Sequence, residues 1–235
     1  MRQRGHLTPS QRERAMKKQF VAIAGNVGVG KSTLTMMLAD RLGCQPFFEA
    51  VGDNPYLADF YKDMKRWSFH SQVFFLSRRL RHHHQLLQHP GSVIQDRTVY
   101  EDAEVFAYNL YRQGNMGERD YRSYRELYQV LVLFLPPPDL IVYLKAPVPV
   151  LQDRIAMRGR DFERDISPRY LEQLNELYDG WIEDFSLCPV LTIPADDLDF
   201  VRFEQDLDQI TNHVLVRLPQ LGEQEEIGVA LPPGA

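Results

Sequence analysis

A glycine-rich segment at residues 25–32, GNVGVGKS, carries the clearest chemistry in this sequence. It fits the pattern G-x-x-x-x-G-K-[ST] without a mismatch, between a predicted buried strand and a predicted helix. Glycine tolerates positive φ angles, so the backbone N–H groups of such a loop can close around phosphate oxygens. Lys31 is placed to reach the β- and γ-phosphates, and Ser32 to offer its hydroxyl to Mg²⁺. We therefore predict a nucleoside triphosphate site made of Gly25, Asn26, Val27, Gly28, Val29, Gly30, Lys31, Ser32 and Thr33.

A second candidate is Glu49, at the end of a predicted strand at residues 47–48. The carboxyl ends of parallel strands face the ligand crevice, so Glu49 is expected near the phosphate loop. A carboxylate there can accept a proton from a hydroxyl group that attacks phosphorus. Alternatively, Glu49 is an exposed polar residue at a strand end, and the residue alone does not decide between these two interpretations.

Four further segments carry a family resemblance when they are taken together with the phosphate loop. They are FFEAVGDNPYLADFY (47–61), RWSFHSQVFFLSRRLR (66–81), VIQDRTVYEDAEVFA (93–107) and RGRDFERD (158–165). In this order and spacing they resemble the deoxynucleoside kinases, and most of all the bacterial deoxyadenosine/deoxyguanosine kinase branch. The resemblance covers residues 20–203. It implies transfer of the γ-phosphoryl group of ATP, with Mg²⁺, to the 5′-hydroxyl of a deoxyribonucleoside.

The resemblance assigns catalytic roles to three of these positions. Glu49 matches the general base, although Ala50 stands where the family usually has proline. Arg97 matches the arginine that holds the 5′-oxygen and the transferring phosphate, and Asp96 lies beside Mg²⁺ or its water shell. Thr98 replaces the usual serine of that motif, which is a mild departure.

The resemblance also assigns the nucleoside contacts. Gln72 and Arg79 are seven residues apart on one predicted helix, so they project from nearly the same face. With Asp102 they match the residues that read the base. Taken singly, they could be a core-edge amide, one charge of a basic run and a first-turn helix acid. The remaining matches are to sugar contacts, Tyr61 and Glu163, and to pocket-lining aromatic positions, Trp67 and Phe106.

A charged segment between two predicted helices contains Arg158, Arg160 and Arg164. It could be an ordinary solvated loop. In an enzyme with a phosphate loop, arginines on such a segment can instead close over the triphosphate and neutralise charge in the transition state. The family lid carries Arg-x-Arg, which Arg158 and Arg160 match, while Arg164 is an additional candidate.

The histidines at 82–84 are tempting as metal ligands. Consecutive helical residues point 100° apart, so the three side chains cannot all face one ion. We predict a solvated helix end instead. The acidic pair at 196–197 follows the last predicted strand, where the family holds the donor base.

The predicted elements alternate between strands and helices. Short apolar runs predict strands at 19–24, 47–48, 92–96, 140–145 and 190–193. Helical spacing predicts helices at 32–42, 55–61, 67–88, 101–112, 118–135, 147–157, 168–185 and 200–218. This order indicates an α/β fold with a five-stranded parallel sheet flanked by helices, as in P-loop nucleoside kinases. The long apolar helices also permit the homodimer that is typical of the family.

The composition and charge of the chain limit the domain organisation, the partners and the cellular compartment that we expect. The 235 residues carry a net charge of −5, but residues 1–18 alone carry +5, which leaves −10 on the rest. We interpret 1–18 as a disordered basic arm without a secretory signal, 19–218 as the kinase domain and 219–235 as a tail. No apolar run approaches the roughly 20 residues that span a bilayer. We expect no membrane or nucleic-acid partner for the body, and two distant cysteines favour a cytoplasmic protein.

Several rival functions share these features. The base is open, because a carboxylate paired with arginine also suits cytosine, and a thymidine-preferring kinase is a further variant. A thymidylate kinase would need basic residues aimed at the phosphate of its acceptor. A non-catalytic nucleotide-binding protein of the same fold is disfavoured by the intact Lys31, Ser32, Glu49 and Arg97.

Overall fold

The centre of the molecule is a sheet of five parallel strands in the order β2-β3-β1-β4-β5. The structure, a computed structural model, describes residues 18–48, 54–160, 163, 166–218 and 221 of the chain. The strands are β1 (Phe20–Gly25), β2 (Gln45–Phe47), β3 (Val93–Asp96), β4 (Leu140–Lys145) and β5 (Val190–Pro194). The predicted α/β fold with a five-stranded parallel sheet is confirmed.

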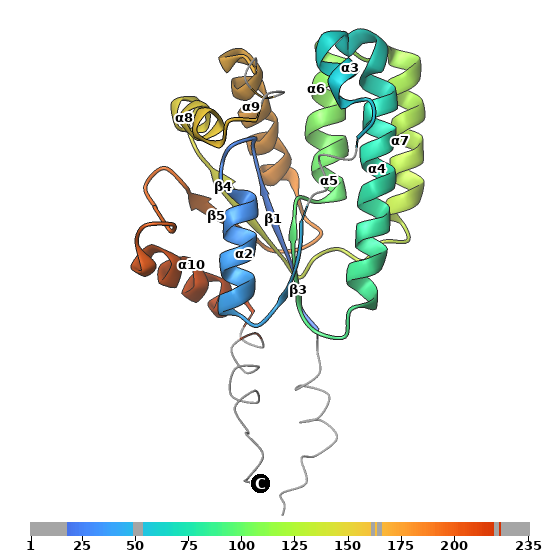
Figure 1. Cartoon of the computed structure of the whole chain (residues 1–235). Coiled ribbons are helices and arrows are strands. Elements are labelled where there is room, and N and C mark those ends of the chain that lie inside the picture. The colour runs from blue at the N-terminus through green and yellow to red at the C-terminus, as the bar shows by residue number, and fades with distance from the viewer. Residues whose placement is uncertain (1–17, 49–53, 161–162, 164–165, 219–220, 222–235) are drawn as a thin grey trace, which may run out of the picture.

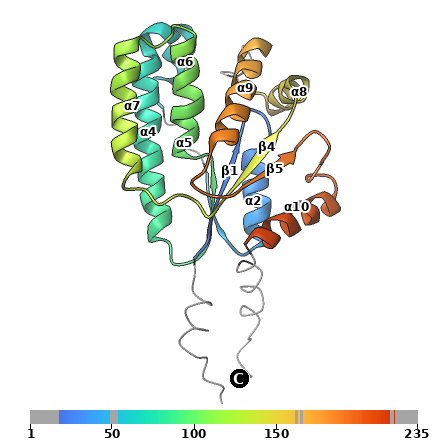
Figure 2. The same cartoon turned by 180° about the vertical axis from the view of Figure 1, so that it is seen from behind.

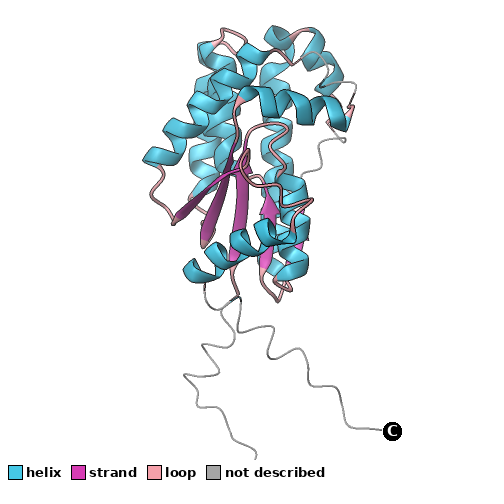
Figure 3. Ribbon diagram, turned by 90° about the vertical axis from the view of Figure 1, so that its left-hand side faces the viewer, coloured by secondary structure: helices cyan, strands magenta, loops and turns pink. Residues whose placement is uncertain are grey.

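Helices cover both faces of this sheet (Figures 1 and 2). They are α2 (Lys31–Arg41), α3 (Leu57–Lys62), α4 (Met64–Gln88), α5 (Val99–Glu101), the π-helical η2 (Asp102–Ala107), α6 (Tyr108–Arg112), α7 (Glu118–Val132), α8 (Val148–Arg158), α9 (Pro168–Asp184) and α10 (Glu204–Arg217). Figure 1 shows α4, α6 and α7 side by side on one flank, and α2 and α10 on the other. Figure 3 shows the twist of the strands between these layers.

Alternate residues of β1 belong to two separate hydrophobic cores, because successive strand residues face opposite sides of a sheet. Val21 and Ile23 pack into the core that contains Leu34 of α2 and Ile210 of α10. The residues between them face the core that contains parts of α4, η2 and α9. All six residues of β1 are buried. A near-continuous apolar run is what burial on both faces requires.

The sheet register brings the functional segments to one edge. Ile23 pairs with Asp96 of β3, and Gly25 pairs with Leu144 of β4. The loop after β1 and the residues after β3 therefore leave the sheet as neighbours, at its carboxyl edge. This edge is where parallel α/β sheets bind ligands.

Several predicted boundaries moved. The second strand is Gln45–Phe47 rather than 47–48, and the last helix begins at Glu204 rather than 200. Helix α4 begins at Met64, three residues early, because Asp63 caps it by accepting from the N–H of Arg66 at 3.2 Å. The helix predicted at 101–112 runs from Val99 to Arg112 with a π-helical centre. Such π-helical turns often mark functional sites.

The prediction of a solvated histidine cluster was wrong for His83. This side chain is buried beneath the start of the sheet, with its ring edge-on to Phe20 at 5.5 Å. Burial lowers the pKa of His83 to about 4, so its ring is neutral at physiological pH. The error arose because α4 turns this one histidine toward the core. Within the described ranges, no three His, Cys, Asp or Glu residues gather into a group that could hold a metal ion.

The structure describes few residues of the predicted N-terminal arm and C-terminal tail. Apart from Lys18 and Leu221, the predicted arm and tail lie outside the described residues. Lys18 donates from Nζ to the carbonyl oxygens of Leu86 and His89, at the end of α4. Across the described residues, no helix has the length and apolar character needed to cross a membrane.

Candidate active site

The phosphate loop joins β1 to α2 in a shape that requires its glycines. Gly25, Gly28 and Gly30 have φ angles of 143°, 82° and 106°. A Cβ atom on Gly25 would lie 2.5 Å from the carbonyl oxygen of Leu144, and one on Gly28 would lie 2.8 Å from that of Leu151. These contacts are with backbone atoms, so no side-chain movement could relieve them. The sequence motif and the local geometry therefore agree.

Lys31 and Ser32 begin α2 and point into the same region. The Nζ atom of Lys31 donates to the carbonyl oxygen of Asn26 at 2.9 Å, and the side chain is buried beneath the loop. The hydroxyl of Ser32 donates a short hydrogen bond to Oδ2 of Asp96. The other carboxylate oxygen, Oδ1, is buried and has no hydrogen-bond partner among the described residues. The Ser32 hydroxyl beside this Asp96 oxygen suits Mg²⁺, which takes few protein ligands and completes its coordination shell with phosphates and water.

Arg97 follows β3 directly in a strained conformation. Its φ angle is 67°, and it is the one non-glycine residue with positive φ in the described structure. Nη1 donates to the hydroxyl oxygen of Tyr178 at 2.9 Å, and the guanidinium lies 4.4 Å from the ring centroid of Phe106. Strain of this kind persists only where the surroundings over-determine the conformation, and it clusters at functional sites.

Glu101 is a site residue that the sequence analysis missed. It is fully buried beside Arg97, with 3.6 Å between Oε1 and Nη1. Burial raises the pKa of its carboxyl, while the charges of Arg97 and Lys31 oppose that rise. The available signal was the pattern Thr98-x-x-Glu101, which forms a capping box at the start of α5.

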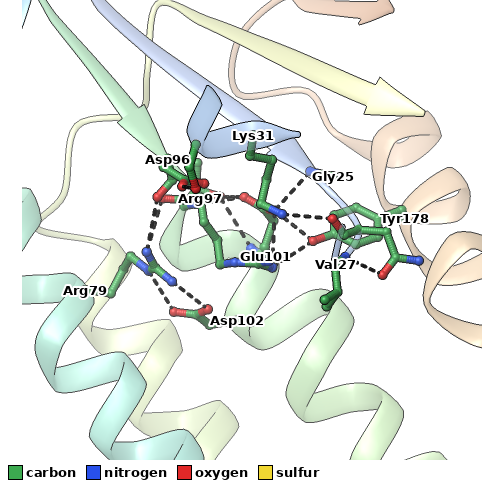
Figure 4. A network of polar contacts seen from close by, with 12 residues as sticks. Gly25, Val27, Lys31, Arg79, Asp96, Arg97, Glu101, Asp102 and Tyr178 are labelled. Carbon is green, nitrogen blue, oxygen red and sulfur yellow. Dashed lines mark hydrogen bonds and ion pairs between the residues drawn. The ribbon is translucent and has the colours of Figure 1, made fainter. Parts of the chain in front are cut away.

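Arg79 and Asp102 form a buried ion pair that is held by two hydrogen bonds. Nε lies 3.0 Å from Oδ2 and Nη2 lies 3.2 Å from Oδ1. Both side chains are at most 5% exposed. The third guanidinium nitrogen, Nη1, donates to the carbonyl oxygens of Asp96 and Arg97, at 3.4 Å each. Figure 4 shows this connection between the ion pair and the residues beside the phosphate loop.

One cavity brings most of the predicted residues together. Those that line it are Val27, Gly28, Lys31, Ser32, Tyr61, Gln72, Asp96, Arg97, Asp102, Phe106, Arg158, Arg160 and Glu163. Residues that we did not predict complete its wall: Leu57, Phe60, Phe75, Ile166 and Tyr170. They are apolar or aromatic, and such side chains show in the sequence only as core positions. The cavity wall therefore combines apolar and aromatic side chains with polar and charged groups.

Two of the predicted nucleoside contacts, Arg79 and Trp67, are not among the residues that line this cavity. Arg79 does not itself line the cavity and reaches it through Asp102. Trp67 is not among the lining residues either, and its ring stacks on Tyr56 with 5.7 Å between centroids. Glu49 and Arg164 lie outside the described residues, so their predicted roles stay predictions.

The predicted lid arginines meet the predicted sugar-binding carboxylate. Arg158 donates to Oε2 of Glu163 from Nε, at 3.0 Å, and from Nη2, while Nη1 of Arg160 lies 3.4 Å from Oε1. The carboxylate is buried, but the arginine side chains are 34% and 40% exposed. Both arginine side chains thus remain partly in contact with solvent.

A second cavity, of about 680 Å³, lies on the other side of these arginines. Its wall combines the phosphate loop, the end of α8 and the segment after β5, with lining residues that include Gly30, Thr33, Arg154, Met157, Arg158, Arg160, Phe200 and Arg202. Arg154, which we did not predict, donates to the carbonyl oxygens of Val29 at 2.9 Å and Ala195 at 2.7 Å. It thereby fixes the phosphate loop to the segment after β5.

The arrangement consists of two cavities that meet at a phosphate loop, with cations at the junction. Positioning and charge neutralisation are what phosphoryl transfer requires of a protein. The fold and site therefore define a P-loop phosphotransferase with separate spaces for donor and acceptor.

Comparison with known proteins names the family within that class. The deoxynucleoside kinase family model matches residues 21–218, so the chain belongs to the deoxynucleoside kinases and is an enzyme. A deoxyadenosine/deoxycytidine kinase of Bacillus subtilis is 38% identical over 200 residues, covering 84% of this chain and 92% of that protein. A deoxyguanosine kinase of the same organism is 35% identical over 199 residues, covering 83% and 95%.

A solved structure supports the same assignment. Deoxyadenosine kinase from M. mycoides, with dCMP and dCDP bound, matches with a TM-score of 0.75 and 31% sequence identity. The match covers 83% of this chain and 98% of that one. The family resemblance found in the sequence is thereby confirmed.

Proposed function

We propose that this kinase transfers the γ-phosphoryl group of ATP to the 5′-hydroxyl of deoxyadenosine or deoxyguanosine, giving the 5′-monophosphate for deoxynucleotide salvage. The observation that carries the proposal is the buried Arg79–Asp102 pair, whose Asp102 lines the same cavity as the phosphate loop. A polar pair in an otherwise apolar recess suits the edge of a purine base. Purine deoxynucleosides are also named as substrates of the two B. subtilis relatives.

At the donor end, the phosphate loop and Lys31 hold the triphosphate, with the donor base in the larger cavity beside Phe200. Ser32 and Asp96 would hold Mg²⁺, because they offer a hydroxyl and a buried carboxylate oxygen without a hydrogen-bond partner among the described residues. When bound, the ion neutralises charge on the phosphate oxygens.

At the centre, Glu49 removes the proton of the 5′-hydroxyl as that oxygen attacks phosphorus. Arg97 binds the 5′-oxygen and the transferring group. Arg158 and Arg160 neutralise the charge that develops on the equatorial oxygens. The position of both lid arginines between the two cavities supports this division of roles.

At the acceptor end, Tyr61 and Glu163 bind the 3′-hydroxyl of the sugar. Gln72 and Asp102 contact the base edge, and Arg79 holds the carboxylate in place. Phe106 packs against the nucleoside, since its ring lines the cavity and lies over Arg97. Trp67 is proposed to support this pocket from outside its lining residues, where its ring stacks on Tyr56.

Deoxycytidine is the second candidate substrate. The B. subtilis relative is named for deoxyadenosine and deoxycytidine, and the M. mycoides structure contains dCMP. Adenine and cytosine each carry an exocyclic amino donor, which a carboxylate such as that of Asp102 can accept. One polar pair can therefore serve both bases.

The test is a substrate panel with the purified protein, ATP and Mg²⁺. We expect the highest kcat/KM with deoxyadenosine or deoxyguanosine, and at least tenfold less with thymidine. A higher kcat/KM for deoxycytidine than for either purine would establish the second candidate. Failure to phosphorylate any of the four deoxynucleosides would overturn the kinase proposal.

We also propose a homodimer formed through α7 and the residues just beyond it. Leu127 and Val130 on α7, with Leu133 and Phe134 just beyond it, are 42–80% exposed. Contiguous apolar side chains of this size are unusual on the surface of a monomer. A second copy of the chain would cover them. Light scattering should give about twice the monomer mass, and Val130→Glu should return the chain to monomer if this face is the interface.

We place the reaction in the cytoplasm. Cys44 and Cys188 are free thiols, as a reducing compartment favours. We propose single nucleosides rather than nucleic acid as partners, because the body is acidic and its site arginines gather around two cavities.

A further inference from the structure

Two buried residues behind Arg97, Glu101 and Tyr178, have no part in the roles proposed so far. Neither lines the nucleoside cavity or the donor cavity. Both are fully buried, and they come from segments 77 residues apart. Their polar groups converge on Arg97 at the point where it passes the start of the phosphate loop (Figure 4).

Both oxygens of the Glu101 carboxylate accept hydrogen bonds. Oε1 accepts from the hydroxyl of Tyr178 at 2.8 Å and from the N–H of Gly25 at 3.3 Å. Oε2 accepts from the backbone N–H of Thr98 at 2.7 Å and from its hydroxyl at 3.2 Å. One carboxylate thus joins the first glycine of the phosphate loop to Thr98, the residue that follows the strained Arg97.

The Tyr178 hydroxyl bridges Glu101 and Arg97. It donates to Glu101 and accepts from Nη1 of Arg97 at 2.9 Å. Burial raises the pKa of this phenol well above its usual value, so the bridging proton stays on Tyr178. The ring is held by stacking on Tyr143, with 5.7 Å between centroids and 17° between planes. The Arg97 guanidinium is therefore hydrogen-bonded to a hydroxyl group whose ring is held by packing.

Charge explains why this support is a carboxylate. The side chains of Arg97 and Lys31 are both buried and both face the phosphate region. Two cations at such a place repel each other unless a counter-charge lies close by. Glu101 supplies it, since both cations act on its carboxyl group.

We propose that Glu101, through the Tyr178 hydroxyl, is a positioning residue that holds the Arg97 guanidinium in register with the phosphate loop. The inference rests on the proposed function, in which Arg97 binds the transferring phosphoryl group. Glu101 itself touches neither substrate. Its removal lowers kcat by misplacing Arg97, while nucleoside and ATP binding persist, because the cavity walls stay in place.

The first measurement compares Glu101→Gln and Tyr178→Phe with wild type. Glutamine keeps the size of the side chain but removes the charge, and phenylalanine keeps the ring packing but removes the bridge. We expect kcat to fall about 30-fold and about fivefold, respectively, with both KM values within threefold of wild type. Glu104→Gln is the matched control, since this partly buried carboxylate lies three residues further along the same helical segment but pairs with Arg125 and lines neither cavity. A kcat within twofold of wild type for both variants would overturn the inference.

The second measurement is a double-mutant cycle with Arg97→Gln, assayed well below the melting temperature of each variant. If Glu101 acts through Arg97, adding Glu101→Gln to Arg97→Gln lowers kcat by less than twofold further. Multiplicative losses would mean that Glu101 acts elsewhere, and would overturn the inference. A normal kcat for Arg97→Gln alone would instead contradict the role proposed for Arg97. If Glu101→Gln does not fold, Tyr178→Phe takes its place in the cycle.

Discussion

The proposed base end and lid end of the acceptor site hold their arginines in opposite ways. At the base end, Arg79 and Asp102 form a two-point pair with both side chains almost fully buried. At the lid end, Arg158 and Arg160 share the carboxylate of Glu163, yet a third or more of each arginine side chain meets solvent. The cavity thus has one fixed end and one hydrated end.

The difference reflects the energetics of charge burial. A buried ion pair has already lost its hydration, so removing one partner leaves a costly unpaired charge. At the lid end the Glu163 carboxylate is buried but the arginines meet solvent, so water competes for the cations and the pair gains less. The buried end therefore suits a fixed recognition task, whereas the exposed arginines can turn from Glu163 to phosphate oxygens at little cost. We expect substitutions at the first end to change stability and those at the second to change turnover.

The largest expected effect is on stability, for Asp102→Asn. Losing the carboxylate leaves the Arg79 guanidinium buried without its counter-charge, so the free energy of unfolding should fall by about 3–5 kcal/mol. Urea denaturation measures this change. The matched variant at the lid end is Glu163→Gln, for which we expect a loss of about 1 kcal/mol or less, because its arginines remain hydrated. Equal losses of unfolding free energy in the two variants would contradict the proposed difference between the base end and the lid end.

The next effect is on turnover, for Arg158→Ala and Arg160→Ala. Each change removes a cation proposed to stabilise the transition state, so kcat should fall by about 100-fold or more. The unfolding free energy should stay within about 0.5 kcal/mol of wild type, as is usual for exposed side chains. Arg122→Ala, on the exposed face of α7, is a suitable control that should change neither quantity. A large loss of stability in either lid variant would show that this end is fixed as well.

A smaller effect separates burial from function, and it concerns His83. The folded-state pKa of about 4 lies below the ordinary value of 6.5, so the unfolded chain takes up the proton first as pH falls. Stability is complete above pH 6.5 and is lost as pH falls toward 4, by about 2 kcal/mol at pH 5.

His83→Leu tests this interpretation. The substitution should remove most of that slope, while kcat at pH 7.5 stays unchanged because His83 touches neither cavity. Unfolding free energies measured from pH 7.5 to 4.5 give the comparison. A slope that survives the substitution would assign the acid sensitivity to other groups.

The smallest effect is expected for Tyr61→Phe, at the edge of the cavity. Loss of one hydrogen bond to the 3′-hydroxyl should reduce kcat/KM by about fivefold to tenfold. With a 2′,3′-dideoxynucleoside, wild type and variant should become equal, since the substrate lacks the bonded group. A persistent difference on that substrate would mean that Tyr61 acts elsewhere.

Local sequence patterns predicted the features that local geometry controls. The phosphate loop has this property, because positive φ angles at Gly25, Gly28 and Gly30 demand glycine where the motif has it. The five-stranded parallel sheet also followed from the alternation of strands and helices. The seven-residue spacing placed Gln72 and Arg79 on one face of α4, and in the structure Gln72 lines the cavity while Arg79 reaches it through Asp102.

Features created by distant segments were not predictable in this way. Glu101 resembles an ordinary first-turn acid until Tyr178, far along the chain, packs against it. His83 looks solvated in a run of three histidines, and only packing beneath the sheet reveals its burial. Trp67 matched a pocket position by resemblance, but its ring stacks on Tyr56 instead of lining the cavity. Each case depends on a tertiary contact that no local pattern encodes.

The central claim is that the acceptor is a nucleoside hydroxyl, and product analysis by ³¹P NMR tests it most directly. The protein is incubated with ATP, Mg²⁺ and deoxyadenosine or deoxyguanosine, and in parallel with thymidine 5′-monophosphate. We predict ADP and the deoxynucleoside 5′-monophosphate in equal amounts from the nucleoside, and no diphosphate from the monophosphate. Release of inorganic phosphate without a nucleotide product, or conversion of the monophosphate to its diphosphate, would contradict the account.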